Sequence, residues 1–301
     1  MVSFKSRAHA RFLESIKISI MLSSNKIISS ALLLVAAGIV GAGCQKMDRP
    51  PMPDYPEDTN PPGGPLKFYA AYDATTVDSI RANFGSDNNI SYVDGISGKA
   101  MQGGANGYIV YGSANDFKRS TSFTVAFWMK KDGPNPAGAG TSFAFGTSST
   151  EGFWHQMSMF MLFEDAGNPS SADLAAVKFS VQDQWFEFTG ARRIPDLLDN
   201  QWHHMAIVFD QSTSMLTFYV DGAPVDIPGG LPADFGKFNN NGGVMDLSKM
   251  GGLVVGGPGH YAAGKTPDAW MGNFGGSIDQ FRLYGEALSA AEVNALFTGK
   301  K

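Results

Sequence analysis

Cysteine is nearly absent from this chain: Cys44 is the only one in 301 residues. A single thiol forms no internal disulfide and no cysteine-based metal cluster. Long apolar runs are lacking too, because the longest, residues 27–42, is glycine-rich and shorter than the ~20 residues that span a membrane. Basic residues are also few, with 23 Lys and Arg against 28 Asp and Glu. Without a cluster of positive charge, this balance argues against binding to nucleic acid or to anionic lipid.

Residues 1–43 have the features of a secretory signal peptide. Five basic residues precede the apolar run and small residues follow it, which is the order found in such signals. Met21 is an alternative start, because the segment beginning there is a complete signal by itself. Removing residues 1–43 leaves 18 basic and 27 acidic residues, a net charge of −9.

Cys44 directly follows VGAG and resembles the lipidation site of bacterial lipoproteins. The resemblance implies cleavage before Cys44 and attachment of a diacylglycerol to its sulfur. Gly41 departs from the pattern, which usually has leucine there. Gln45 is not the aspartate that holds lipoproteins at the inner membrane of enteric bacteria. We therefore expect a location at the outer membrane or cell surface, with a lipid anchor as the only membrane contact.

Proline dominates the next segment, with seven in the 22 residues 45–66. Such a chain is extended and buries no core. We expect residues 44–66 to be a lipidated cysteine with a proline-rich tether, and residues 67–301 to form one domain.

Short apolar or alternating segments recur between glycine-rich turns throughout residues 67–301. In one of them, SFTVAFWMK, alternate residues from Phe123 to Met129 line one face, as in a half-buried strand. Asp221-Gly222 stands between two such segments and predicts a two-residue hairpin. Ser289 and Glu292 form a capping box for one short C-terminal helix, which ends near Gly299 and packs through Leu288, Val293, Leu296 and Phe297. The pattern predicts an all-β sandwich or jelly roll.

His203 and His204 follow Trp202 at the start of another apolar segment. Side chains on a strand alternate between faces, so two adjacent histidines point in opposite directions and share no metal ion or substrate. We expect both to serve the packing and hydrogen bonding of the sheets.

Four stretches together resemble the LamG-like domains of the concanavalin A-like lectin/glucanase superfamily. They are VDGISGKAMQGGANGYIVY, SFTVAFWMK, QWHHMAIVFDQSTSMLTFYVDGAPV and GSIDQFRLYGEALSAAEVNALF, which occur in the family's order and cover most of residues 92–298. The resemblance implies a jelly-roll sandwich of two antiparallel sheets.

Glycoside hydrolases of this superfamily carry two glutamates on one strand in the pattern Glu-x-Asp-x-x-Glu, where acid and nucleophile can lie ~5 Å apart. None of the six glutamates after residue 43 lies in this pattern; they are Glu57, Glu151, Glu164, Glu187, Glu286 and Glu292. The stretches typical of alginate-lyase-like members are absent as well. The sequence therefore predicts a protein without catalytic activity.

LamG-like domains frequently hold calcium, and the resemblance makes Asp279 the first candidate ligand, with Asp73 as a second. Gly95 or Gly98 carbonyls would complete the oxygen shell that calcium needs. Gln280 replaces the family's second aspartate. The alternative is that Asp279 only caps a turn or pairs with Arg282.

Sugar binding needs aromatic rings with a few polar groups around them. Trp128 and Trp202 lie in core-like strands and are expected to be buried. The candidate ligand-binding residues are Trp154, Trp185, His260, Tyr261 and Trp270, the last three in one glycine-rich loop. The alternative is that these rings cover a hydrophobic rim. A second long loop, residues 229–243, could border the same site.

The predicted function is that of a lipid-anchored, non-catalytic protein that captures a polysaccharide or other glycan. Envelope proteins of an uptake system are expected as further partners by analogy alone. The alternatives are a protein-binding or adhesin module, and a glycoside hydrolase or polysaccharide lyase with an atypical site.

Overall fold

The computed structural model describes residues 63–134, 140–164, 171, 173–239 and 244–300. The predicted signal peptide, Cys44 and most of the tether lie outside these residues. Within the described part of the chain, no helix has the length and apolar character that crossing a membrane requires.

The larger sheet has ten strands and contains the first strand of the domain, which begins at Leu66. Its main path runs β17-β16-β15-β8-β20-β1-β2-β3, and β6 pairs with both β20 and β5. All its strand pairs are antiparallel. In chain order the strands are β1 (Leu66–Ala70), β2 (Val77–Asp78), β3 (Asn83–Phe84), β5 (Ser91–Asp94), β6 (Lys99–Gln102), β8 (Phe123–Asp132), β15 (Asp199–Asp210), β16 (Met215–Val220), β17 (Ala223–Pro224) and β20 (Ser277–Tyr284).

The second sheet has eight strands in the order β13-β12-β10-β9-β18-β7-β4, with β19 added beside β9. Its pairs are antiparallel except for the short parallel pair of β19 and β9. The strands are β4 (Ser86–Asn88), β7 (Tyr108–Tyr111), β9 (Thr141–Ser149), β10 (Met157–Glu164), β12 (Val177–Val181), β13 (Gln184–Phe188), β18 (Met250–Val255) and β19 (Met271–Asn273). A separate pair joins β11 (Leu174–Ala175) and β14 (Ile194–Pro195), and four 3₁₀ helices complete the elements: η1 (Asn115–Arg119), η2 (Trp154–Gln156), η3 (Gly190–Arg192) and η4 (Gly259–Ala263).

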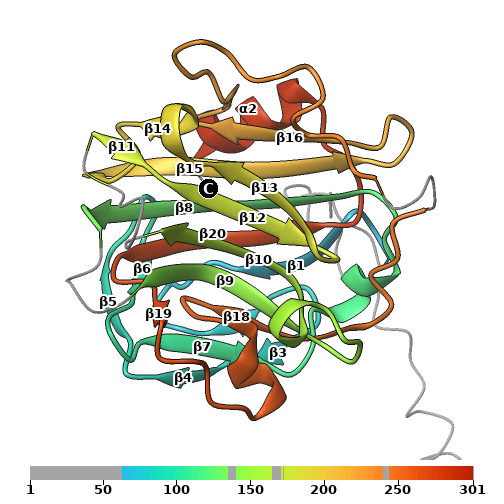
Figure 1. Cartoon of the computed structure of the whole chain (residues 1–301). Helices are drawn as coiled ribbons and strands as arrows, with labels where there is room; N and C mark the ends of the chain where they lie inside the picture. Colours follow the sequence, from blue (N-terminus) through green and yellow to red (C-terminus); the bar gives the residue numbers. More distant parts are fainter. Residues whose placement is uncertain (1–62, 135–139, 165–170, 172, 240–243, 301) are drawn as a thin grey trace, which may run out of the picture. The chain divides into compact units, whose positions relative to one another are not determined.

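The main core lies between the two sheets, which overlie each other in Figure 1. Phe123, Val125, Phe127 and Met129 of β8 all belong to this core, which confirms the alternation read from the sequence. Opposite them, alternate residues of β10 and β12 such as Met161 and Phe179 fill the same layer. The all-β jelly-roll sandwich predicted from the sequence is therefore confirmed.

β15 confirms the strand prediction for the adjacent histidines. Met205 and Ile207 point into the main core, whereas Ala206 and Val208 belong to a separate cluster on the outer face of the same sheet. His204 lies on that outer face, with its ring 5.2 Å from Trp128. His203 lies on the other face and contacts two carboxylates instead.

The hairpin and helix signals are also confirmed. Asp221 and Gly222 both have positive φ, +50° and +76°, and connect β16 to β17 as a tight turn. Helix α2 (Ala290–Gly299) starts with the reciprocal Ser289–Glu292 capping box. The helix packs on the outer face of the ten-stranded sheet, at the top of Figure 1. Its predicted contacts form there: Leu288, Val293 and Leu296 join the outer cluster, and Phe297 stacks on Trp128 at 5.5 Å.

Candidate functional site

Three of the tryptophans singled out in the sequence meet on the outer face of the eight-stranded sheet. The ring of Trp154 lies 4.9 Å from that of Trp185 and 5.3 Å from that of Trp270, with interplanar angles of 81° and 53°. All three side chains are partly buried. Beneath them lies an apolar layer of Phe143, Met157, Phe160, Leu162 and Met271.

Each ring comes from a different element, which is why their proximity is a tertiary feature. Trp185 stands on β13, where it alternates with core residues Phe186 and Phe188. Trp270 directly precedes β19, and its carbonyl accepts a hydrogen bond from Thr141 Oγ1 at 3.0 Å. Trp154 lies in η2, and its backbone N–H donates to a carboxylate oxygen of Asp183 in the turn between β12 and β13.

The backbone at η2 is strained in the way that functional turns often are. His155 and Gln156 have φ values of +45° and +58°, a left-handed region that non-glycine residues rarely occupy. The His155 ring lies next to Trp154, with centroids 4.1 Å apart, and its centroid is 5.4 Å from that of Trp270. His155 Nδ1 is 3.3 Å from Asp268 Oδ2.

These rings border a pocket of about 340 Å³ that we call the tryptophan cleft. It is lined by Gly140, Thr141, Trp154, Leu162, Glu164, Lys178, Trp185 and Trp270. Rings and aliphatic groups thus supply most of the wall, and three polar side chains supply the hydrogen-bonding groups. A partly apolar pocket with few polar groups is the usual form of a small-ligand or sugar site.

Lys178 is held between two carboxylates at one edge of the cleft. Its Nζ lies 2.5 Å from Glu164 Oε2 and 3.0 Å from Glu187 Oε1, and 5.8 Å from the centre of the Trp185 ring. Burial lowers the pKa of Lys178, but the hydrogen bonds to Glu164 and Glu187 outweigh it, so the pKa is raised overall. The lysine therefore stays charged, and its charge is paired with Glu164 and Glu187.

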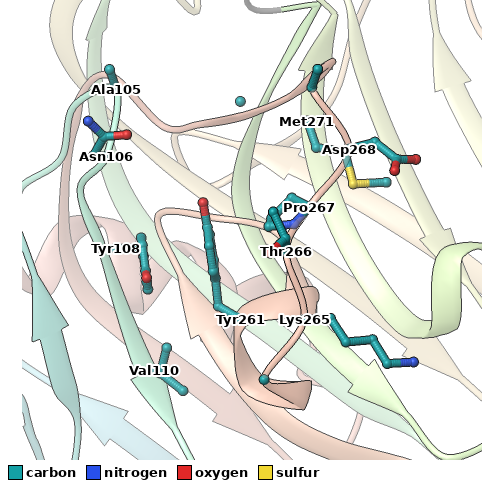
Figure 2. Close-up of a pocket in the computed structure, with 13 residues that line it drawn as sticks. Ala105, Asn106, Tyr108, Val110, Tyr261, Lys265, Thr266, Pro267, Asp268 and Met271 are labelled. Atoms are coloured by element: carbon teal, nitrogen blue, oxygen red, sulfur yellow. The ribbon is translucent and has the colours of Figure 1, made fainter.

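The loop that carries His260, Tyr261 and Trp270 serves two pockets rather than one. The ring of His260 lies 6.0 Å from that of His155, on the side of the tryptophans. Tyr261 instead stacks flat on Tyr108, at 3.7 Å and 3°, in a neighbouring pocket of about 630 Å³ (Figure 2). Asp268 also lines that pocket, so it lies between the two sites.

Burial favours the neutral form of the His260 imidazole. Burial and the nearby His155 lower the pKa of His260, so that its imidazole is neutral near pH 7.

Of the two tryptophans expected to be buried, Trp128 is 1% exposed, whereas Trp202 at the start of β15 is only partly buried.

None of the described residues of the second long loop lines the cleft, and the loop packs instead against the main core through Phe235 and Phe238. Gln184, next to Trp185, donates to the Lys237 carbonyl at 2.5 Å and accepts from the Asn239 amide at 2.7 Å. Residues 240–243 of this loop lie outside the described part of the chain.

The two candidate calcium ligands converge on the turn between β5 and β6. Asp279 is fully buried, and its Oδ2 accepts from the amides of Ile96 and Ser97 at 2.8 and 3.3 Å. Asp73 is exposed, and its Oδ1 accepts from the Lys99 amide at 2.7 Å. The turn-capping role considered for Asp279 is therefore real, and Arg282 bonds to the carbonyl and side chain of Gln280.

One carboxylate oxygen at this turn lacks a partner that a cation would supply. Asp279 Oδ1 is buried and has no hydrogen-bond partner among the described residues. Burial, together with the charge of Asp73, raises the pKa of Asp279 to about 6 despite backbone hydrogen bonds from Ser97, Ile96 and Gln280 that lower it. A cation would supply the missing partner and charge, although the described residues contain no group of three or more His, Cys, Asp or Glu side chains arranged for a metal.

Several residues of the cleft were missed by sequence reasoning. Glu164, Lys178 and Glu187 were not recognised as site residues, and Tyr108 was not connected with Tyr261. Part of this group could have been predicted from the sequence. Trp185 and Glu187 alternate with core phenylalanines, so both side chains lie on the outer face of the sheet. Nothing in the sequence shows that β10 and β12 bring Glu164 and Lys178 to the same place.

Solved structures share the fold at low sequence identity. Domain 4 of AbnA, an extracellular arabinanase from Geobacillus stearothermophilus, in complex with arabinotriose, is 18% identical with a TM-score of 0.51, over 77% of this chain and 98% of that one. The binding domain of Paraclostridial Mosquitocidal Protein 1 is also 18% identical, with a TM-score of 0.51, over 78% of this chain and 52% of that one. The botulinum neurotoxin serotype C1 binding domain is 11% identical, with a TM-score of 0.50 and coverage of 78% and 52%.

This chain thus spans about half the length of the two toxin structures. A search of curated protein sequences found no match. A family model matches residues 102–294, almost two thirds of the chain, and this range includes strands of both large sheets. The two-sheet sandwich and this match agree: the chain belongs to the concanavalin A-like lectin/glucanases superfamily.

Proposed function

We propose that this protein is a non-catalytic, lipid-anchored glycan-binding protein of the bacterial envelope, and that the tryptophan cleft is its binding site. The observation that carries the proposal is the meeting of Trp154, Trp185 and Trp270 beside the polar groups of Glu164 and Lys178. Sugars have apolar faces that pack on rings and hydroxyl groups that need polar partners. An arabinanase domain of the same fold binds arabinotriose, which supports the proposal at the level of the fold.

The arrangement of the carboxylates supports a binding role over hydrolysis. Hydrolysis of a glycosidic bond uses two carboxyl groups that both face the bond. Glu164 and Glu187 instead face the ammonium group of Lys178, which lies between them. We propose on this ground that the cleft holds a sugar without cleaving it.

Binding is tested with the purified full-length chain in a detergent that contains no sugar, against a panel of soluble polysaccharides that includes linear arabinan, β-glucan and xylan. We expect at least one polymer to bind, and Trp185→Ala or Trp270→Ala to weaken that binding roughly tenfold, as loss of a central aromatic contact does. Trp202→Ala is the matched control, because Trp202 is partly buried on the other sheet.

Other outcomes point to the other functions. If no polymer in the panel binds, the proposal is wrong and a protein-binding module takes its place. Release of reducing ends or of unsaturated sugars would show that the protein is an enzyme. If Trp202→Ala weakens binding as much as Trp185→Ala does, the cleft is not the site.

Two further parts of the proposal concern the anchor and a cation. We propose that Cys44 carries the lipid, at the outer membrane or cell surface. Replacement of Cys44 tests this, because the chain should then leave the membrane fraction. We also propose that calcium binds at Asp279 and Asp73, where it would act as a structural ion; a chelator should then lower the melting temperature.

A further inference from the structure

One carboxylate lines the tryptophan cleft, and three others contact residues in or beside it. Glu164 lines it, and Glu187 shares Lys178 with Glu164. Asp183 accepts from the Trp154 amide, and Asp268 contacts His155, whose ring lies next to Trp154 and Trp270. These four groups come from the end of β10, from β13, from the β12–β13 turn and from the loop before β19.

The positive charge at the cleft is paired with carboxylates of the protein itself. Lys178 is the only Lys or Arg among the described residues that line the cleft. A lysine has three N–H donors, and Glu164 and Glu187 take at least two of them. The lysine side chain is 21% exposed, so its contacts are sheltered from solvent. His260 is neutral near pH 7, and His155 is paired with Asp268.

An anionic ligand would therefore meet more carboxylate charge than the single ammonium group of Lys178 balances. One ammonium group shared by two carboxylates leaves a formal charge of −1 at that edge, and the shelter of the site strengthens the repulsion of a second anion. A neutral hydroxyl group is not repelled by the carboxylates. It can donate a hydrogen bond to them and accept one from the remaining ammonium N–H.

We propose that the cleft selects glycans that carry no carboxylate or sulfate groups and discriminates against uronate and sulfated polymers. This inference rests on the proposed function and adds the chemical class of the ligand to it. Charge selectivity follows from the contacts of Lys178, whereas the tryptophan rings bind sugars of either class.

The test uses a pair of probes with one backbone. The polysaccharide that binds best in the panel is derivatised at its hydroxyl groups in two ways, with neutral hydroxyethyl ethers and with carboxymethyl ethers of similar size, and both forms are titrated against the full-length chain in 0.5 M NaCl. At that salt concentration the Debye length is about 4 Å, so the net charge of the whole protein is screened and only close groups act. We expect the carboxymethylated form to bind at least about tenfold more weakly.

Variants show whether the cleft carboxylates cause this difference. Glu164→Gln/Glu187→Gln frees Lys178 and should bring the two dissociation constants to within about twofold of each other. Glu164→Gln alone should reduce the difference part of the way, and Lys178→Gln should increase it. Asp116→Asn is the control, because Asp116 of η1 pairs with the exposed Arg81, and its replacement should leave the ratio unchanged. Melting temperatures confirm that each variant is folded.

Equal binding of the two probes to the wild-type chain would overturn the inference and leave the proposed function intact. So would a preference for the neutral probe that the double variant does not relieve, because the carboxylates would then not be its cause. Absence of binding to every neutral polymer is a different result, which overturns the proposed function and this inference together.

Discussion

His203 and His204 are neighbours in the sequence and occupy opposite electrostatic environments. His203 lies between two carboxylates, with Nδ1 2.9 Å from Asp221 Oδ2 and Nε2 3.0 Å from Asp199 Oδ1. The bond to Asp221 chiefly raises the pKa of His203, with burial opposing and Asp199 adding to it. His204 is fully buried, and burial lowers its pKa to about 4. Neither ring nitrogen of His204 has a partner among the described residues.

Replacing His204 should therefore change how stability depends on pH. Between pH 4 and about 6.5, the unfolded chain binds a proton at His204 and the folded chain does not, so the free energy of unfolding rises with pH. This range corresponds to at most about 3 kcal/mol. His204→Leu removes the titrating group and should flatten the rise, which urea unfolding at pH values from 4.5 to 8.5 would measure.

His203→Gln is the matched control, because its effect has the opposite sign. The raised pKa of His203 means that its contribution is full below about pH 6.5 and is lost as the pH rises through the folded-state value. Its replacement should remove stability at low pH and leave the rise caused by His204. A wild-type slope below pH 6.5 in His204→Leu would contradict the assignment.

At the scale of elements, the turn between β5 and β6 depends on two carboxylates from outside the hairpin. Asp279 of β20 caps its start and Asp73 caps its end. Gly98 has φ +62°, and a Cβ there would collide with the Asp73 carboxylate, so the turn requires glycine at this position. Bringing two carboxylates together costs free energy unless a cation or a proton compensates them.

Calcium at this turn should stabilise the whole domain. We expect 1 mM calcium to raise the melting temperature by roughly 5–10 °C over the chain in chelator at pH 7.5, if the ion is present at about 100 times its dissociation constant. Below about pH 6 the shift should shrink, because protons then compete for Asp279. Differential scanning calorimetry measures both effects.

Two variants make this prediction specific. Asp279→Asn should abolish the calcium-dependent shift, because it removes the buried charge. Asp94→Asn should preserve it, since Asp94 lies on the same hairpin but pairs with Lys99 in solvent. Identical melting curves with calcium and with chelator would refute the calcium proposal and leave Asp279 as a turn cap alone.

At the scale of the whole molecule, the proposed lipid anchor would hold the folded domain at the membrane. A diacylglycerol supplies the two acyl chains that stable membrane attachment takes, and the chain carries fewer basic than acidic residues, 23 against 28. We expect the wild-type chain in the membrane fraction of a bacterial host and Cys44→Ser in the soluble fraction. Mass spectrometry of the mature N-terminus is the direct check, and a Cys44→Ser chain that stays with the membrane would disprove the attachment.

Local patterns were enough to predict much of the sandwich. The alternation in β8, the Asp221-Gly222 turn and the capping box of α2 are short-range signals, and each is confirmed. They can be read from the sequence because a strand period, a turn and a helix cap each depend on a few consecutive residues. The opposite faces of His203 and His204 follow from the same period.

The site was predictable only in part. Trp154, Trp185 and Trp270 stood out because large rings in polar or glycine-rich surroundings need an explanation. Their meeting at distances of 4.9 and 5.3 Å depends on the order of β9, β10, β12 and β13 in one sheet. The same strand order separates Tyr261 from them and pairs it with Tyr108.

The sequence by itself determined the class of fold, the alternation of its strands and the scarcity of cysteine and positive charge, because these are properties of single residues or of near neighbours. Only the tertiary structure decided that Lys178 lies between Glu164 and Glu187, and that Asp73 and Asp279 share one turn. The physical reason is that charge compensation depends on distances of a few ångströms, and strand pairing sets those distances between residues far apart in the chain.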